Sequence, residues 1–240
     1  MEIITEAKKH NEICETFINT PHSIFSELPK DLKTSINKNT SCMFFKKGET
    51  IYKEGDEPKG LTCLVTGKVK IYKEGIGGKK QIVRMAKPVG FIGYRAFFAR
   101  EIHIASAEAL EDSIICTIKS QIIRSIVSTS ADTAMLIIQA LATDLGFSHR
   151  RTVTLTQKHI RARLAEALLV LIETYGLESD NKTLKVYITR EDLSNLSNMT
   201  TANAIRTLSS FSSEGIVKLI GKKIIITDMD KLIATNNEEK

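Results

Sequence analysis

Residues 188–211, ITREDLSNLSNMTTANAIRTLSSF, contain two short amphipathic patterns separated by a polar turn. The first has a helix-start signal, because Thr189 can cap a helix and Asp192 follows at the capping-box spacing. The second begins at Thr200 or Thr201, and its apolar residues recur at helical spacing. We expect its buried face to carry Ala204, Ile205, Leu208 and Phe211, and its opposite face to carry Ala202, Asn203, Arg206 and Ser210.

Segments on both sides extend this pattern. Upstream, QKHIRARLAEALLVLIETYG predicts an amphipathic helix closed by Gly176, and LKVYIT (184–189) predicts a strand. Downstream, IVKLI and KIIITD predict two strands joined around Gly221, with a frayed NNEEK tail at the end. Helix, strand, two helices and a hairpin make a winged helix-turn-helix, which can place one helix in the major groove of DNA.

The residue types on the free face suit double-stranded DNA. Thr200 and Thr201 lie at a helix N-terminus, where free N–H groups favour phosphate. Arg206 can donate two hydrogen bonds to guanine, and Asn203 can contact phosphate or adenine. Wing lysines can contact the flanking backbone, and these are Lys218, Lys222 and Lys223. The structural alternative is an ordinary helical hairpin with a solvated polar face.

Short apolar runs separated by glycine turns fill residues 44–119. The runs lie in CMFFKKGETIYKEGD, LTCLVTGKVKIYKEG, QIVRMAKPVGFIG and SAEALEDSIICTIK. Strands so short and so regularly spaced predict a small barrel or sandwich. Without helical crossovers between them, a parallel α/β sheet is not expected. Residues 23–38 predict a short helix that leads into this region.

From about Ser120 the pattern becomes helical, with a short helix over 120–128 and a long one from 131 to 155. One apolar stripe of the long helix has the spacing of a coiled-coil seam: Met135, Ile138, Ala142, Leu145, His149 and Thr152. A second stripe holds Ile137 and Leu141. Two stripes suit a helix that packs on its own domain and on a second copy of the chain. One wide core-facing stripe in a monomer fits equally well.

Composition sets broad limits on the function. The net charge of +6 permits an acidic partner such as DNA without establishing one. No apolar run approaches the roughly 20 residues of a membrane span, and the N-terminal MEIITEAKKHNE lacks the apolar core of a signal peptide. We therefore expect a cytoplasmic protein with no membrane partner. No P-loop, GxSxG or HExxH motif is present, so no enzyme activity is expected.

Five segments, in this order, resemble the Crp/Fnr family of bacterial transcription regulators from about Ser23 to Leu232: FKKGETIYKEGD, VTGKVKIY, VGFIG, ITREDLSNLSNMTTANAIRTL and GIVKLIGKKIIITD. The resemblance implies an α+β fold with an N-terminal β-roll (cupin-like, of the cyclic-nucleotide-binding-domain type), a long dimerisation helix and a C-terminal winged helix-turn-helix. The corresponding ranges are 1–130, 131–155 and 156–240.

The resemblance also implies a homodimer that binds a palindromic operator and acts on RNA polymerase. The residues expected to contact DNA are Thr189, Thr200, Thr201, Ala202, Asn203, Arg206, Lys218, Lys222 and Lys223. Those expected at the dimer contact are Ile138, Leu141 and Leu145. A sensor module whose output is a protein partner is the alternative, but such a module has no need of a polar recognition face beside a basic hairpin.

The predicted effector site departs from the nucleotide-binding members of the family. Tyr94 stands where they carry a ribose-binding glutamate, and His103 and Ile104 fall near their phosphate-binding arginine and serine. Arg100 is a possible substitute in a shifted register. The residues expected around the effector are Gly93, Tyr94, Arg100, His103, Ile104, Ser148 and His149. We expect an unidentified small-molecule effector other than a cyclic nucleotide; a cyclic-nucleotide sensor remains the alternative.

The redox and haem branches of the family can also be compared with this sequence. Cys116 matches one iron–sulfur ligand, but the other three should form a close N-terminal cluster, where this chain has only Cys14. We therefore expect Cys116 to be a buried strand thiol, all four cysteines to be reduced, and no metal or cofactor. Either His103 or His149 could serve as an axial haem ligand, which is the haem-sensor alternative.

Overall fold

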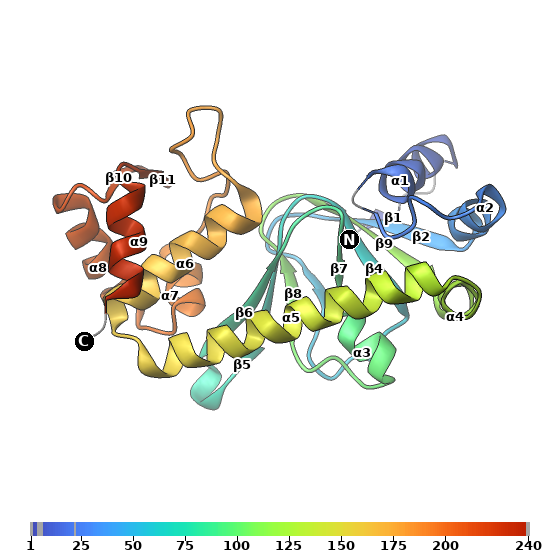
Figure 1. The fold of residues 1–240 in the computed structure, drawn as a ribbon, viewed down its shortest axis with the longest axis horizontal. Coiled ribbons are helices and arrows are strands. Elements are labelled where there is room, and N and C mark those ends of the chain that lie inside the picture. Colours follow the sequence, from blue (N-terminus) through green and yellow to red (C-terminus); the bar gives the residue numbers. More distant parts are fainter. Residues whose placement is uncertain (1, 4–6, 22, 239–240) are drawn as a thin grey trace. The chain divides into compact units, whose positions relative to one another are not determined.

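The computed structural model describes residues 2–3, 7–21 and 23–238 (Figure 1). The chain divides into two compact units, one made of Met1–Lys73 with Ala86–Gly146 and one of Glu74–Met85 with Phe147–Lys240. Among the described residues, no single helix has the length and apolar character to cross a membrane. The helices Ser120–Thr129 and Ala131–Gln157 meet that test only as a pair, and they are bent by 110°.

The β-rich part of the chain forms two antiparallel sheets. In chain order its elements are β1 (Glu2–Ile3), α1 (Ala7–Asn19), α2 (Lys30–Lys38), β2 (Thr40–Phe45), β3 (Thr50–Tyr52), β4 (Gly60–Thr66), β5 (Val69–Glu74), the 3-10 turn η1 (Ile76–Gly78), β6 (Lys80–Ala86), β7 (Gly90–Ile92), α3 (Tyr94–Ala99), β8 (Ser106–Ala109), β9 (Ser113–Lys119) and α4 (Ser120–Thr129). The strand orders are β1-β2-β9-β4-β7 and β3-β8-β5-β6. The predicted short strands are confirmed, and Gly48, Gly55 and Gly67 turn between them at positive φ.

Apolar side chains of the two sheets face one another in one core, which includes Leu64, Val69, Ile71, Ile92, Ala107 and Ile115. This is the expected β-roll. A second core lies on the other face of the larger sheet and joins it to α1, α2 and α4 through Phe17, Ile36, Ile118 and Ile123. The helix predicted over 23–38 begins only at Lys30, because residues 23–28 form hydrogen-bonded turns and Pro29 precedes the first helical turn. The short helices α1 and α3 were not predicted.

A single long helix, α5 (Ala131–Gln157), follows α4 and confirms the prediction for residues 131–155. Its buried side includes Thr133, Ile137 and Arg151, each at most 7% exposed. The six residues of the predicted seam are all exposed. The stripe that faces the protein and the stripe that faces away are therefore separate.

The remaining elements form a helical unit with a small hairpin: α6 (Ile160–Tyr175), α7 (Arg190–Leu196), α8 (Thr201–Ser213), β10 (Val217–Ile220), β11 (Lys223–Ile226) and α9 (Met229–Asn237). Figure 1 shows α9, which was not predicted, beside α6, against which it packs. The strand predicted over 184–189 is wrong, since Leu184 alone among these residues forms an isolated bridge, to Leu177. Alternate burial of Leu184, Val186 and Ile188 produced the strand-like pattern without a ladder partner.

The cysteines differ from the prediction. Cys42 and Cys116 form a disulfide, so the expectation of four reduced thiols is wrong for this pair. These residues lie far apart in sequence, but the antiparallel register of β2 and β9 places them directly opposite each other. Cys14 and Cys63 are free and buried. Burial raises the pKa of the Cys14 thiol to about 11 and raises that of Cys63 further, which keeps both protonated at neutral pH.

Candidate nucleic-acid interface

Side-chain caps fix where the two helices of the opening stretch begin. The Thr189 hydroxyl oxygen accepts from the Asp192 amide at 2.9 Å and donates to the Asp192 carboxylate at 2.7 Å. Thr200 caps α8 by accepting from the Asn203 amide at 3.2 Å. Both caps satisfy N–H groups that a helix leaves without partners in its first turn. Thr189 and Thr200 are thus the N-cap residues of α7 and α8, and both remain exposed to solvent.

The two faces of α8 differ clearly. Its buried residues are Ala204, Thr207, Leu208 and Phe211. Its exposed residues include Thr201, Ala202, Ile205, Arg206 and Ser209, while Asn203 is half-buried. Ile205 was expected inside and is 47% exposed, because Thr207 takes the inward position on the turn between Ala204 and Phe211. The exposed Ile205 and Ser209 are candidate contact residues that the sequence reading missed.

Arginines of α5 and α6 form hydrogen bonds to the end of α7, to the turn between α7 and α8, and to the residue after α8. Arg163 donates to the Asn198 carbonyl at 2.8 Å, and Arg151 donates to the Leu196 carbonyl at 2.5 Å. Arg161 makes a two-pronged pair with Glu214 at 2.9 and 2.6 Å, just past the end of α8. That guanidinium, with the Ser210 hydroxyl, lowers the pKa of Glu214 to about 2. These contacts fix α8 on its inner side and leave the face with Arg206 exposed.

The hairpin β10–β11 carries the three predicted lysines, Lys218, Lys222 and Lys223, and all are exposed. The preceding loop braces it, because the Leu184 amide donates to the Ile224 carbonyl at 2.9 Å. Asp180 fixes that loop by accepting from the Thr183 hydroxyl and from the amides of Thr183 and Lys182, which lowers the pKa of its carboxyl to about 2. The unit therefore joins a polar helix face and a basic hairpin.

In the β-roll, two rings fill the space beside Gly93. The buried His103 ring stacks on Tyr52 with centroids 3.9 Å apart. Gly93 has φ +65°, and a Cβ there would come within 2.5 Å of His103 Cε1. The backbone of His103 is also bound, with its amide donating to the Asp56 carbonyl at 2.9 Å. Burial lowers the pKa of His103 despite the nearby Asp56 carboxylate, so its ring is neutral at neutral pH.

The other residues expected around the effector are dispersed. Tyr94 is buried, and its hydroxyl donates to the Asp144 carboxylate of α5 at 2.5 Å. Arg100 ends α3 at φ 57° and is exposed, as is Ile104. Ser148 and His149 are exposed on α5. The structure thus places His103 against Gly93, buries Tyr94 in the second core and leaves the remaining four at the surface.

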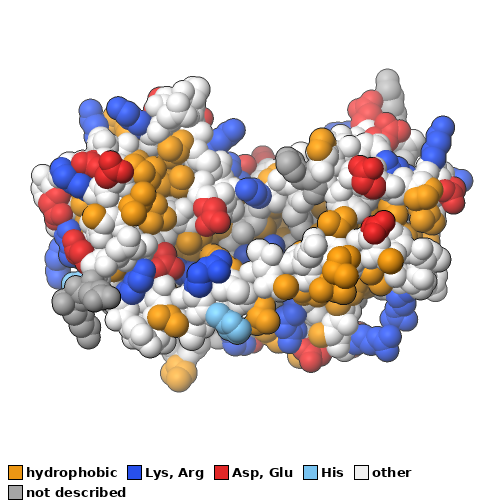
Figure 2. Space-filling view, in the orientation of Figure 1, with side chains coloured by type: hydrophobic (Ala, Val, Ile, Leu, Met, Phe, Trp, Pro, Cys, Tyr) orange, Lys and Arg blue, Asp and Glu red, His pale blue; other side chains and the backbone are white. Residues whose placement is uncertain are grey.

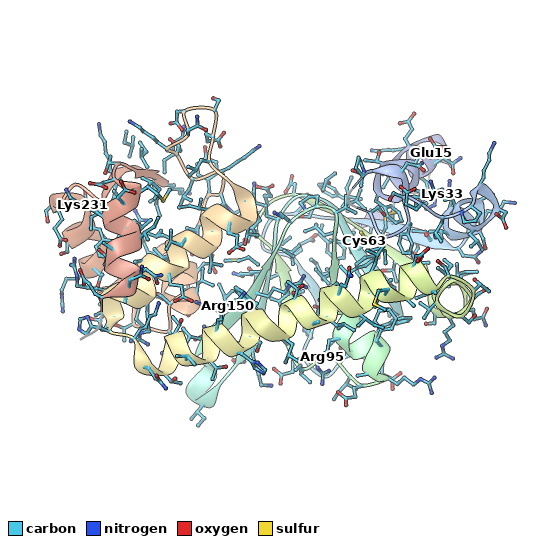
Figure 3. The ribbon with its side chains drawn as sticks, in the orientation of Figure 1. Glu15, Lys33, Cys63, Arg95, Arg150 and Lys231 are labelled. Carbon is cyan, nitrogen blue, oxygen red and sulfur yellow. A yellow bond between two sulfur atoms is a disulfide. The ribbon has the colours of Figure 1, made fainter. Side chains whose placement is uncertain are left out.

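His149 also lines a groove within the second unit. This groove of about 620 Å³ lies among α5, α6 and α9, and its lining includes Arg150, Arg151, Lys158 and Glu166. Figure 3 labels Arg150 on α5. Glu166 is already engaged there, since it accepts from Thr154 at 2.6 Å and pairs with Lys158 at 3.1 Å.

The exposed stripe of α5 is apolar. Met135, Ile138 and Leu145 are 53%, 55% and 57% exposed, whereas Leu141 is half-buried. Figure 2 shows hydrophobic side chains gathered over the N-terminal half of this helix. Large aliphatic side chains in a row on one outer helix face are typical of a surface that packs against another protein.

Two family models match the chain: a cyclic nucleotide-binding domain over residues 42–130 and a Crp-like helix-turn-helix domain over 162–235. Electron transport regulator A of Shewanella oneidensis is 28% identical over 78% of this chain and 74% of its own length. The CRP-like cAMP-activated global transcriptional regulator of Mycobacterium tuberculosis is 21% identical over 87% of this chain and 94% of its own.

Solved structures have the same fold. FixK2 from Bradyrhizobium japonicum gives a TM-score of 0.74 at 23% identity and covers 84% of this chain and 99% of its own. A CooA mutant from Carboxydothermus hydrogenoformans gives 0.73 at 18% identity, over 92% of this chain and 96% of its own. The chain therefore belongs to the Crp/Fnr family of transcription regulators, and it is a regulator with a helix-turn-helix DNA-binding domain rather than an enzyme.

Proposed function

We propose that this protein is a cytoplasmic, sequence-specific regulator that binds a palindromic operator as a homodimer. One observation carries the proposal: α8 is capped and braced on its inner side and exposes Arg206 on its outer side, next to a hairpin with three exposed lysines. In the major groove, Arg206 would supply base discrimination through two hydrogen bonds to guanine. The lysines, with Thr189, Thr200, Thr201 and Asn203, would contact the DNA backbone.

The homodimer would form along the seam of α5. Its exposed residues Met135, Ile138 and Leu145 recur at the three- and four-residue spacing by which two helices interlock. Leu141, half-buried, would border the contact. A dimer presents two copies of α8, which fits half-sites one helical turn apart, about 34 Å. RNA polymerase is the partner expected of a regulator bound in this way.

We further propose that the effector is not a cyclic nucleotide. A cyclic phosphate is an anion, and binding it in a partly dry roll requires a charged donor. The residue near that position, His103, is neutral and stacked on Tyr52. The Tyr94 hydroxyl is engaged by the Asp144 carboxylate, which would repel a phosphate. Arg100, Ile104, Ser148 and His149 lie exposed, and of these four Arg100 carries the charge that a cyclic phosphate would need.

The DNA proposal is tested on an operator obtained by selection from random duplexes. Arg206→Ala should cost about 1–3 kcal/mol of discrimination between that operator and a scrambled duplex. Arg124→Ala, at an exposed position on α4, is the matched control and should leave binding unchanged. If Arg206→Ala kept the full preference for the operator, α8 would not be the recognition helix.

Calorimetry tests the effector proposal separately. We expect no micromolar binding of cAMP or cGMP to the dimer and no effect of either on operator affinity. Micromolar binding of cAMP that Arg100→Ala abolishes would overturn the proposal and make the protein a cyclic-nucleotide sensor.

A further inference from the structure

The four cysteines of the chain gather in one part of the first unit. The register of three adjacent strands pairs Cys42 with Cys116 and Cys116 with Cys63. Residues paired directly across strands project from the same face of a sheet. Cys14, from α1, belongs to the same buried core as these three residues. Figure 3 labels Cys63 among the strands. No local pattern predicts this grouping, because the cysteines come from four separate elements: α1, β2, β4 and β9.

Helix α1 adds a nitrogen donor to the sulfur atoms. His10 and Cys14 are one helical turn apart and share a face, with His10 Nε2 3.4 Å from Cys14 Sγ. A ring nitrogen of His10 and the sulfurs of Cys14 and Cys42 all lie within 4.8 Å of one another. Cys14 and Cys42 are buried and His10 is half-buried, so the three donors meet at the edge of the core.

The spacing of these donors suits a single metal ion. Zn²⁺ prefers four ligands in a tetrahedron, with Zn–S near 2.3 Å and Zn–N near 2.0 Å, which places neighbouring donor atoms roughly 3.3–3.8 Å apart. Small side-chain rotations bring donors within 4.8 Å to that spacing. A four-iron cluster binds each cysteine to a different iron atom and therefore needs sulfurs farther apart. Thiolate and imidazole are also the donors that zinc favours.

We propose that the reduced chain binds one Zn²⁺ through His10, Cys14, Cys42 and Cys116. Cys116 lies outside the group of three donors, but the register of β2 and β9 places it directly opposite Cys42 and the disulfide joins the two sulfurs. After reduction, rotation of its side chain toward the ion would supply the fourth ligand. Cys63 is excluded, since it lies two strands from Cys42, which is about 9–10 Å at the usual strand spacing. The ion would tie α1 to β2 and β9. This inference does not depend on how the protein reads DNA.

The metal site and the disulfide exclude each other, because the same two sulfurs form both. Oxidation by hydrogen peroxide would remove two electrons from the thiolates of Cys42 and Cys116 and form the S–S bond. The peroxide O–O bond breaks, and with two protons its oxygens leave as two waters. Zn²⁺ is released without a change of oxidation state. A thiol reductant would reverse the reaction at sulfur and restore the ligands.

Cobalt(II) provides a direct probe, because thiolate-to-cobalt absorption and tetrahedral ligand-field bands report the ligands. The full-length protein is reduced, freed of metal with a chelator and titrated with Co²⁺ and then Zn²⁺ under anaerobic conditions. We expect one Co²⁺ per chain, displaced by one Zn²⁺, and no uptake after peroxide treatment until a reductant is added. His10→Ala and Cys14→Ser should each weaken binding at least tenfold.

Controls separate the site from the stability of the core. Cys63→Ala changes an equally buried cysteine and should bind Co²⁺ as the unchanged protein does. His10→Ala alters only a half-buried side chain on α1, so it tests the site even if Cys14→Ser fails to fold. A reduced protein that takes up no Co²⁺ would overturn the proposal, and so would unchanged affinity in His10→Ala. Assembly of a four-iron chromophore that requires the same residues would overturn it as well.

Discussion

Leu145→Glu tests the proposed dimer most directly. Fully burying a leucine side chain contributes about 1.5–3 kcal/mol. Leu145 is 57% exposed in the single chain, so roughly half of that contribution, about 0.8–1.5 kcal/mol per copy, remains to be gained on association. Two copies give about 1.5–3 kcal/mol. Two glutamates facing each other about 6 Å apart add repulsion of about 3 kcal/mol at an effective dielectric constant of 20.

The total of about 4.5–6 kcal/mol corresponds to a dimer dissociation constant raised by roughly three to four orders of magnitude. Sedimentation velocity at roughly 1 to 100 μM protein, where a dimer with a submicromolar dissociation constant stays associated, should show that this variant is a monomer. Its binding to the operator should be much weaker than that of the unchanged protein. Leu136→Glu is the matched control: Leu136 is 42% exposed but lies outside the seam, so its effect should stay within about 0.5 kcal/mol. Equal loss in both variants, or an unchanged protein that is monomeric at micromolar concentration, would refute the seam.

Three further predictions concern the roll, the second unit and the wing. Gly93→Ala should lower the free energy of unfolding in urea by about 2–5 kcal/mol, the sum of left-handed backbone strain and overlap with the His103 ring. Gly215 has φ +74° and open space around an added Cβ, so Gly215→Ala should lower the free energy of unfolding only by the backbone strain. Equal losses of unfolding free energy in the two variants would contradict an overlap with the His103 ring. The pair of Arg161 with Glu214 stabilises the fold above the unfolded glutamate pKa and loses this effect as pH falls to about 2, so the stability difference between wild type and Glu214→Gln should shrink on acidification and not grow. Lys222→Ala should weaken all duplexes alike and reduce the salt slope of binding by about 0.9, whereas a loss confined to the operator would argue against a backbone contact.

Local signals account for what could be predicted from the sequence. The caps at Thr189 and Thr200 and the turn at Gly67 each lie within a few residues of the structure they start or end. The α5 seam was predictable because a continuous helix converts sequence spacing directly into a face. These signals were enough for the short strands, the long helix and the helix pair α7–α8, but not for α1, α3 and α9.

Features that depend on distant residues were not predictable in this way. The Cys42–Cys116 disulfide requires the register of β2 and β9, which no local pattern gives. Stacking of His103 on Tyr52 depends on how the loop before β8 meets the end of β3. The strand prediction for residues 184–189 was wrong for the opposite reason, because alternate burial of Leu184, Val186 and Ile188 imitates a strand where no strand partner is present among the described residues. The exposed Ile205 shows that helical spacing predicts which side of a helix is buried more reliably than it predicts which residues border that side.

The exposed Ile205 has a consequence for the base composition of the operator. It shares the outer face of α8 with Ala202, and that face has a single cation, Arg206. In the major groove, only thymine presents a methyl group, and aliphatic side chains recognise it by contact. Each half-site should therefore contain one guanine that binds Arg206 and neighbouring thymines whose methyl groups contact Ala202 and Ile205. Replacing those thymines with uracil, which lacks only the methyl group, should weaken binding while leaving every hydrogen bond intact.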